Sequence, residues 1–105
     1  MLIQINTDDN VNSSDTLTNW VEATVRDILG RFSDQVTRVE IHLSDENSDK
    51  KSGGSDMRCL LEARLAGRQP VAVTDAAATL EQAVDGAVRK MRRSLDSTLG
   101  RLQKR

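Results

Sequence analysis

The chain has 105 residues, of which 37% are apolar and 30% charged, and its formal net charge is −1. This composition is typical of a soluble globular protein, and the length suffices for one small core, so we expect a single domain over residues 1–105. One cysteine excludes an internal disulfide and a multi-thiolate metal site, and an aromatic content of 2%, Trp20 and Phe32, disfavours a surface that stacks nucleobases.

The first part of the chain is predicted to form a strand and a helix. Residues 2–6, LIQIN, alternate in the pattern of a short strand. Ser13 or Ser14 is suited to cap a helix that begins at about Asp15 and ends at residue 31 or 32. Apolar residues recur at helical spacing here, so we expect them on one apolar stripe, both aromatic rings included. The stripe consists of Leu17, Trp20, Val21, Val25, Ile28, Leu29 and Phe32.

The middle of the chain is predicted to form two half-buried strands joined by a loop. Residues 36–43, VTRVEIHL, alternate between apolar and polar side chains, which puts His42 on the exposed face. Residues 57–66, MRCLLEARLA, alternate again, and here Cys59 shares the inward phase with Leu61 and Leu65. Between them, residues 44–56 contain no apolar side chain, which predicts a mobile loop.

The last part of the chain is predicted to form a strand and a long helix. GRQ makes a turn, and the only proline, Pro70, begins a strand over residues 70–74, which fits an edge position. From Asp75 a helix with one apolar stripe is expected to run to the C-terminus. The fold class is therefore α+β, with the order β-α-β-β-β-α in two layers. We expect a four-stranded mixed sheet, its first two strands parallel and the others antiparallel, with both helices on one face.

Catalytic and metal-binding chemistry is poorly supported. His42 and Cys59 fall on opposite faces of the predicted sheet, so they cannot form a nucleophilic pair, and one His with one Cys shows no ligand spacing. The loop over residues 44–56 departs from the ligand pattern of a calcium loop, and Gly53-Gly54 lacks the Gly-Lys-Ser/Thr ending of a phosphate loop. We expect no enzyme activity, no cofactor, no metal and no small-molecule substrate.

Residues 89–105, RKMRRSLDSTLGRLQKR, carry seven basic groups and one acidic group, so the remainder of the chain has a charge of −7. On the predicted helix most of these cations lie opposite the apolar stripe. A cationic stripe of this length is typical of phosphate-backbone binding. Cations also complement a helix dipole, but only within its last turn, and Arg89 to Arg93 lie earlier. A solvated face, a protein contact and a membrane-surface contact remain open as alternatives.

The chain resembles a known family in three features. These are the order of its strands and helices, LIQIN near the N-terminus, and the segment AVDGAVRKM with its basic continuation. In these features it resembles the short ribosome hibernation-promoting factors. This family is also called ribosome-associated translation inhibitors or sigma-factor modulation (S30AE-like) proteins. The resemblance implies a non-enzymatic factor that binds the small ribosomal subunit through rRNA phosphate contacts and sterically inhibits translation under stress or in stationary phase. RNA-contact roles carry over best to Lys90, Arg93 and Arg101. The complete predicted set is Lys90, Arg93, Arg101, Arg89, Arg92, Lys104, Arg26 and Arg31.

Partners and location follow from the same features. No apolar run reaches the ~20 residues that cross a bilayer, and MLIQINTDDN lacks a secretory signal, so we expect a cytoplasmic protein without membrane or DNA partners. The chain stops after the final helix, so we expect no self-driven ribosome dimerisation. One alternative is a protein-interaction module whose acidic body and loop contact a basic protein. Another is recognition of double-stranded RNA by shape, for which Lys50-Lys51 offers only one of two further contact points.

Overall fold

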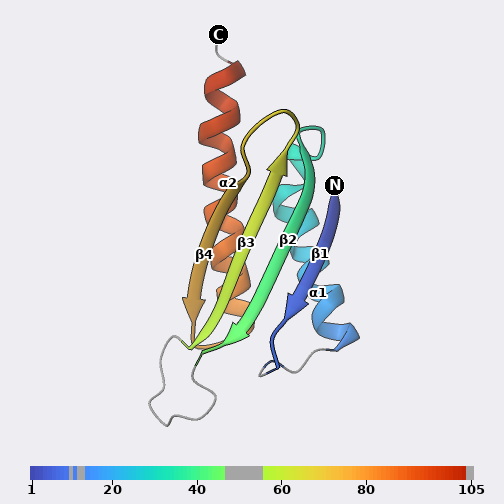
Figure 1. Ribbon diagram of the computed structural model, residues 1–105, viewed down its shortest axis with the longest axis vertical. Coiled ribbons are helices and arrows are strands. Elements are labelled where there is room, and N and C mark those ends of the chain that lie inside the picture. The colour runs from blue at the N-terminus through green and yellow to red at the C-terminus, as the bar shows by residue number, and fades with distance from the viewer. Residues whose placement is uncertain (10, 12–13, 47–55, 104–105) are drawn as a thin grey trace.

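The computed structural model describes residues 1–9, 11, 14–46 and 56–103, with only the backbone for residues 101–103. Strands and helices alternate in the predicted order β-α-β-β-β-α, with a short 3-10 turn after the first helix (Figure 1). The elements are β1 (Leu2–Thr7), α1 (Asp15–Leu29), η1 (Gly30–Phe32), β2 (Val36–Asp45), β3 (Met57–Leu65), β4 (Val71–Ala77) and α2 (Leu80–Gln103).

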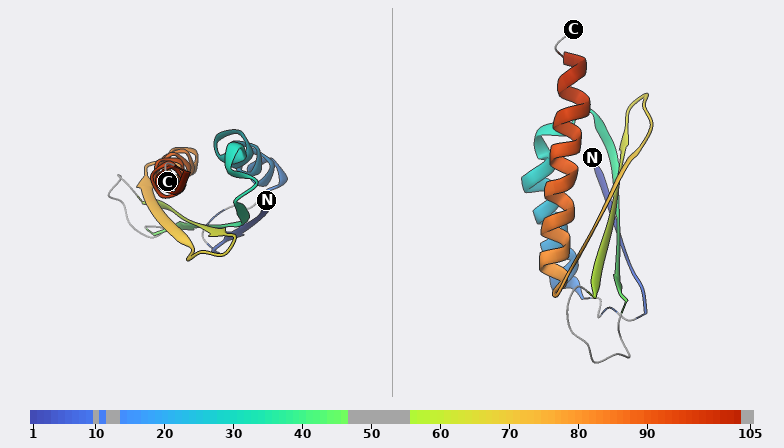
Figure 2. Two further views of the ribbon diagram at one scale, coloured as in Figure 1. Left: turned by 90° about the horizontal axis from the view of Figure 1, so that it is seen from above. Right: turned by 90° about the vertical axis from the view of Figure 1, so that its left-hand side faces the viewer.

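One mixed sheet forms the first layer, with the strand order β1-β2-β3-β4. β1 pairs in parallel with β2, whereas β2 with β3 and β3 with β4 pair antiparallel, as predicted. β4 is an edge strand, and Pro70 precedes it at the position where a missing N–H costs no ladder bond. Both helices cover the same face of the sheet (Figure 2). These findings confirm the predicted α+β architecture.

The two helices begin at one end of the molecule, where β1, β2 and β4 also end and β3 begins (Figure 1). We call this the helix-start end. At the opposite end, α2 runs past the sheet (Figure 1). The sequence positions that open each helix therefore lie next to the tips of the strands.

The core lies between the sheet and the helices, and it contains the residues that the alternation predicted. Cys59, like its inward-facing neighbours on β3, is buried, whereas His42 is exposed on the open face of the sheet. Both predicted phases are thereby confirmed. The largest fully buried side chains are Leu29, Ile41, Leu43, Leu61, Met91, Leu95, Val21, Val25, Val36, Val39, Val84 and Val88.

The first helix begins as predicted and ends slightly earlier. The side-chain oxygen of Ser14 accepts a hydrogen bond of 3.1 Å from the Leu17 N–H, so Ser14 is the N-cap. The α-helix ends at Leu29, and the next three residues tighten into a 3-10 turn that buries Phe32. The predicted end at residue 31 or 32 therefore includes this turn.

The second helix begins later than predicted. Asp75 lies in β4, and α2 begins at Leu80, so the predicted helix start at Asp75 is wrong. β3 is nine residues long and pairs with β4 as far as Met57 opposite Ala77, which keeps the chain extended. Thr79 provides the cap, because its side-chain oxygen accepts a 3.1 Å hydrogen bond from the Gln82 N–H.

Trp20 does not lie within the buried stripe of the first helix. Its relative exposure is 37%, whereas Val21 and Val25 are fully buried. The helix turns the latter two toward the sheet and leaves the indole ring at the margin of the core. The prediction that both rings are covered therefore holds for Phe32 and is wrong for Trp20.

The predicted loop over residues 44–56 is shorter at its N-terminal side. Ser44 and Asp45 belong to β2, and the Glu46 N–H donates a 2.8 Å hydrogen bond to the Asp56 carbonyl. The strand pairing thus continues beyond the last apolar residue of β2, because backbone hydrogen bonds do not require apolar side chains. Residues 47–55, including Lys50, Lys51 and the glycine pair, lie outside the described part of the chain.

Candidate nucleic-acid interface

α2 exposes three arginines to solvent within five residues of its sequence. Val88, Met91 and Leu95 face the core, so the opposite side of α2 faces solvent. Arg89, Arg92 and Arg93 are all exposed. The side chains of Arg92 and Arg93 make no hydrogen bond or ion pair with any other described residue, so their donors are available to an anionic ligand.

Lys90 lies on a different side of α2 from these arginines, against β4. Its Nζ atom lies 3.0 Å from Oδ1 of Asp75 and donates a 2.8 Å hydrogen bond to the Thr74 carbonyl. The Lys90 side chain remains 42% exposed. It therefore fastens α2 to the sheet edge, and contact with a phosphate requires the ammonium group to leave or share the Asp75 carboxylate.

Arg89 and Arg26 are held in ion pairs within their own helices. Arg89 pairs with Asp85 at 3.0 Å, and Arg26 pairs with Glu22 at 3.1 Å, each one turn apart. All four side chains are more than 40% exposed. Exposed pairs of this kind contribute little to stability, so an anionic ligand can replace the carboxylates at small cost.

Arg31 joins the end of the first helical segment to α2. Its guanidinium pairs with Asp96 and lies over the Phe32 ring, with 4.9 Å between Cζ and the ring centroid. The planar cation is therefore oriented from two sides. The predicted site residue Arg31 is brought beside α2 in this way, although it lies far from α2 in the sequence.

Two predicted site residues are only partly described or not described. Arg101 lies in the final turn of α2, where only the backbone is described. Lys104 lies outside the described residues. The exposed cations of α2 whose side chains are described therefore lie within residues 89–93, which we call the basic segment of α2.

Acidic residues collect at the helix-start end, which the charge totals did not reveal. Exposed carboxylates lie at the end of β1, in the first turn of each helix and after β2. They belong to Asp9, Asp15, Glu81 and Glu46. The sequence could have indicated this cluster. Each of these residues lies close to the start or end of a strand or helix, and the order of the elements brings those boundaries to the same end of the sheet. Among the described residues, these four carboxylates lie at the helix-start end together with the exposed Arg58 of β3, and the basic segment lies farther along α2.

The two residues suited to nucleophilic or acid–base chemistry stay apart. Cys59 is buried in the core, where burial, reinforced by the nearby Asp75 carboxylate, raises the pKa of its thiol to about 12. The His42 side chain is 46% exposed on the opposite sheet face, 3.8 Å from Glu40. Within the described residues no group of three His, Cys, Asp or Glu side chains is arranged to hold a metal ion. In the same part of the chain, no helix has the length and apolarity to cross a membrane.

The fold and these cations together define a two-layer α+β protein with an exposed basic segment on its terminal helix. The chain belongs to the family described as Sigma 54 modulation protein / S30EA ribosomal protein, whose model matches residues 3–103. This match confirms the resemblance drawn from the sequence.

Two solved structures share the fold over nearly their whole length. The N-terminal domain of Protein Y from Thermus thermophilus has a TM-score of 0.74 at 22% identity, covering 92% of this chain and 98% of that one. A ribosomal subunit interface protein from Coxiella burnetii has a TM-score of 0.73 at 16% identity, covering 95% and 99%. No curated protein sequence matches this chain significantly.

Proposed function

We propose that this protein is a single-domain, non-enzymatic cytoplasmic factor that binds the small ribosomal subunit and inhibits translation under stress or in stationary phase. The observation that carries the proposal is the exposed basic segment of α2, in which Arg92 and Arg93 have no partner among the described residues. Membership of a ribosomal family supports the choice of rRNA as the polyanion. One structural relative, a ribosomal subunit interface protein, supports the same choice.

The proposed contacts join arginine side chains to rRNA phosphates. The arginines differ in whether a carboxylate partner must first be displaced. Arg92 and Arg93 contact phosphates directly, and their guanidinium groups can donate two parallel hydrogen bonds to one phosphate. Arg89, Arg26 and Arg31 exchange an exposed carboxylate partner for a phosphate. The remaining predicted contacts are Lys90, Arg101 and Lys104.

The proposed action is steric and needs no chemistry. A compact two-layer domain that occupies an RNA-lined channel excludes messenger or transfer RNA from the same space. Affinity then depends on counterion release from the rRNA, which makes it sensitive to salt. Because the helix-start end is acidic, the same rRNA repels that end, and the charge polarity favours one orientation of the bound protein.

The test is co-sedimentation of the purified protein with small and large ribosomal subunits over a series of salt concentrations. We expect binding to the small subunit, with a slope of log affinity against log salt of about −3.5 to −4.5 when Arg26, Arg31, Arg89, Arg92 and Arg93 each contact one phosphate. The slope should be steeper when the other three cations also take part. Binding that is independent of salt, or that is equal for both subunits, would contradict the proposed contacts.

A further inference from the structure

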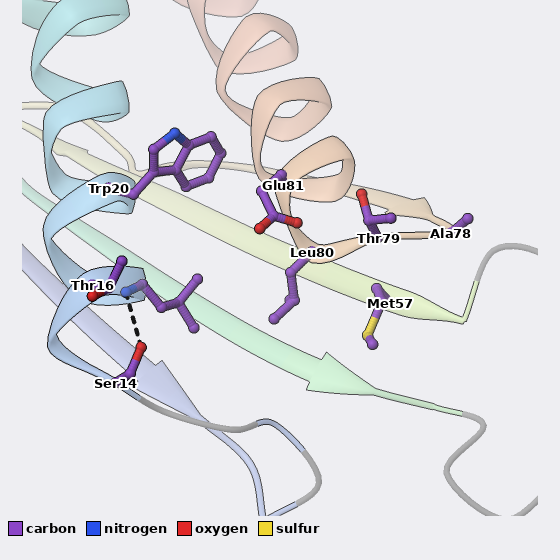
Figure 3. A pocket seen from close by; sticks show the side chains of 9 residues that line it. Ser14, Thr16, Trp20, Met57, Ala78, Thr79, Leu80 and Glu81 are labelled. Atoms are coloured by element: carbon purple, nitrogen blue, oxygen red, sulfur yellow. Dashed lines mark hydrogen bonds between the residues drawn. The ribbon is translucent and has the colours of Figure 1, made fainter.

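A surface pocket lies at the helix-start end, about two turns of α2 before the basic segment. It has a volume of about 570 Å³ and opens between the first turns of α1 and α2 (Figure 3). Its walls come from both helices and from the beginning of β3. The lining side chains used below are Thr16, Leu17, Trp20, Met57, Leu80 and Glu81. The volume is within the range of pockets that hold a small ligand or one or two side chains.

The lining of this pocket is mainly apolar and incompletely covered. Trp20 is 37% exposed, and its indole extends from α1 toward α2 across the opening (Figure 3). Leu17, Leu80 and Met57 pack against the core but remain half-exposed. Apolar surface of this kind gains free energy when another apolar group covers it. Since Trp combines a large ring with few rotatable bonds, it is the residue best suited to anchor such a contact.

One carboxylate lines the pocket, and others lie at the same end of the molecule. Glu81 lines it, and Asp15 lies between two lining residues in the first turn of α1. Asp9 is exposed two residues after β1, at the same end of the molecule. None of these three carboxylates forms an ion pair with a described residue. An anionic ligand is repelled here, whereas a cationic one is attracted and oriented.

We propose that this pocket binds a short protein segment in which apolar side chains are flanked by lysine or arginine. The apolar side chains would lie against Trp20 and Leu80, and the flanking cations would pair with Glu81 and Asp15. This surface is separate from the basic segment that carries the proposed ribosome contacts. The helix-start end thus binds a different partner from the rRNA proposed for the basic segment.

The chain itself and RNA fit this pocket less well. Residues 47–55 follow β2 at the same end, but their sequence, NSDKKSGGS, contains no apolar side chain that could cover Trp20. A second copy of the chain offers cations at residues 89–93, yet Met91, the apolar side chain among them, is fully buried. RNA could stack a base on the indole ring, but its phosphates would meet the carboxylates at this end of the molecule. A peptide that carries both basic and apolar side chains complements the apolar lining of the pocket and the negative charge beside it.

Trp20 makes the pocket directly observable. It is the only tryptophan and the chain has no tyrosine, so intrinsic fluorescence reports the pocket alone. We would titrate the full chain with a hexapeptide of two leucines flanked on each side by two lysines. The expected result is a saturable blue shift of the Trp20 emission. Replacing the leucines by glycine, or the lysines by glutamate, should weaken binding about tenfold or more.

Charge variants of the protein complete the test. Glu81→Lys combined with Asp15→Lys should weaken binding of the lysine-flanked peptide about tenfold. Arg92→Glu with Arg93→Glu, which alters the basic segment instead, should leave it as tight or slightly tighter. The proposals for the two surfaces can therefore be refuted independently, since ribosome binding is measured by sedimentation and peptide binding by fluorescence.

Four results would overturn the proposal. Equal affinity for the glycine peptide would mean attraction by charge alone. A change in Trp20 emission on dilution of the protein without peptide would make a second copy the occupant. Tighter binding of an oligouridine than of the peptide would make the pocket a base-stacking site. Unaltered peptide affinity in the Glu81→Lys, Asp15→Lys variant would remove the role of the carboxylates.

Discussion

Lys90 of α2 and Asp75 of β4 form an ion pair of 3.0 Å between Nζ and Oδ1, which fastens the terminal helix to the edge strand. The same carboxylate lies over Gly86, one turn before Lys90. A Cβ atom at residue 86 would overlap Asp75 Oδ2 and lie 2.7 Å from its Cγ. Gly86 is thus the residue that lets Asp75 reach Lys90, which explains a glycine in the middle of a helix.

Gly86→Ala should stabilise the protein less than Gly100→Ala does. Alanine is favoured over glycine in helices by about 1 kcal/mol, and a Cβ at residue 100 meets nothing within 4 Å, so Gly100→Ala should gain up to about that amount. At residue 86 the displaced Asp75 carboxylate should cancel the gain, leaving a deficit of about 1–2 kcal/mol relative to Gly100→Ala. Urea denaturation of both variants measures the difference.

The Asp75→Ala background provides the control for this pair. Once the carboxylate is removed, Gly86→Ala should recover most of the stabilisation expected from helix propensity. A Gly86→Ala variant that stabilises the wild-type protein as much as Gly100→Ala does would show that Asp75 does not occupy this space.

Asp96→Asn should strengthen ribosome binding while slightly weakening the fold. Asp96 pairs with Arg31, and both side chains are more than 40% exposed, so losing the pair should cost less than about 1 kcal/mol of unfolding free energy. Arg31 then becomes available to phosphate, and we expect affinity for the small subunit to rise about two- to fivefold. Co-sedimentation and urea denaturation measure the two effects. Asp9→Asn carries the same charge change at the helix-start end, and an equal rise in that variant would refute a specific role for Arg31.

Stability should fall in alkaline solution because of Cys59. Burial in the folded state raises the pKa of its thiol from 9.0 to about 12, so the unfolded chain releases the proton first as the pH rises. The contribution of Cys59 is fully present below about pH 9 and is lost between about pH 9 and 12, at up to ~1.4 kcal/mol per pH unit. Cys59→Ala lacks this term but keeps every lysine. The difference in unfolding free energy between wild type and Cys59→Ala should therefore shrink from pH ~8 to pH ~10, and a constant difference would be contrary to this account.

The strand faces were predictable because alternation is a local property. Val39 and His42, for example, take opposite sides of the sheet as their positions in the sequence require. The start of α2 was not predictable in the same way. Asp75 precedes three alanines, which favours a helix locally, but pairing with the long strand β3 keeps it extended. That pairing depends on residues distant in the sequence.

The candidate site was predictable only in outline. The spacing of Arg89, Arg92 and Arg93 placed them on the solvent side of a helix, and they are exposed. Lys90 was predicted as an RNA contact together with them, yet its side chain contacts β4. Trp20 has helical spacing suited to the core but lies at its margin. In both cases the surroundings of the side chain depend on how the helix is oriented against the sheet. The periodicity of the sequence does not give that orientation.

The most direct test of the proposed function compares two double variants with the same change in formal charge. Arg92→Glu with Arg93→Glu alters the basic segment, whereas Arg58→Glu with Arg68→Glu alters exposed arginines at the start of β3 and in the turn before β4. In co-sedimentation with small ribosomal subunits at fixed salt, the first pair should lower affinity about tenfold or more, and the second less than about threefold. Equal loss in both variants, or no loss in the first, would contradict an rRNA contact through the basic segment of α2.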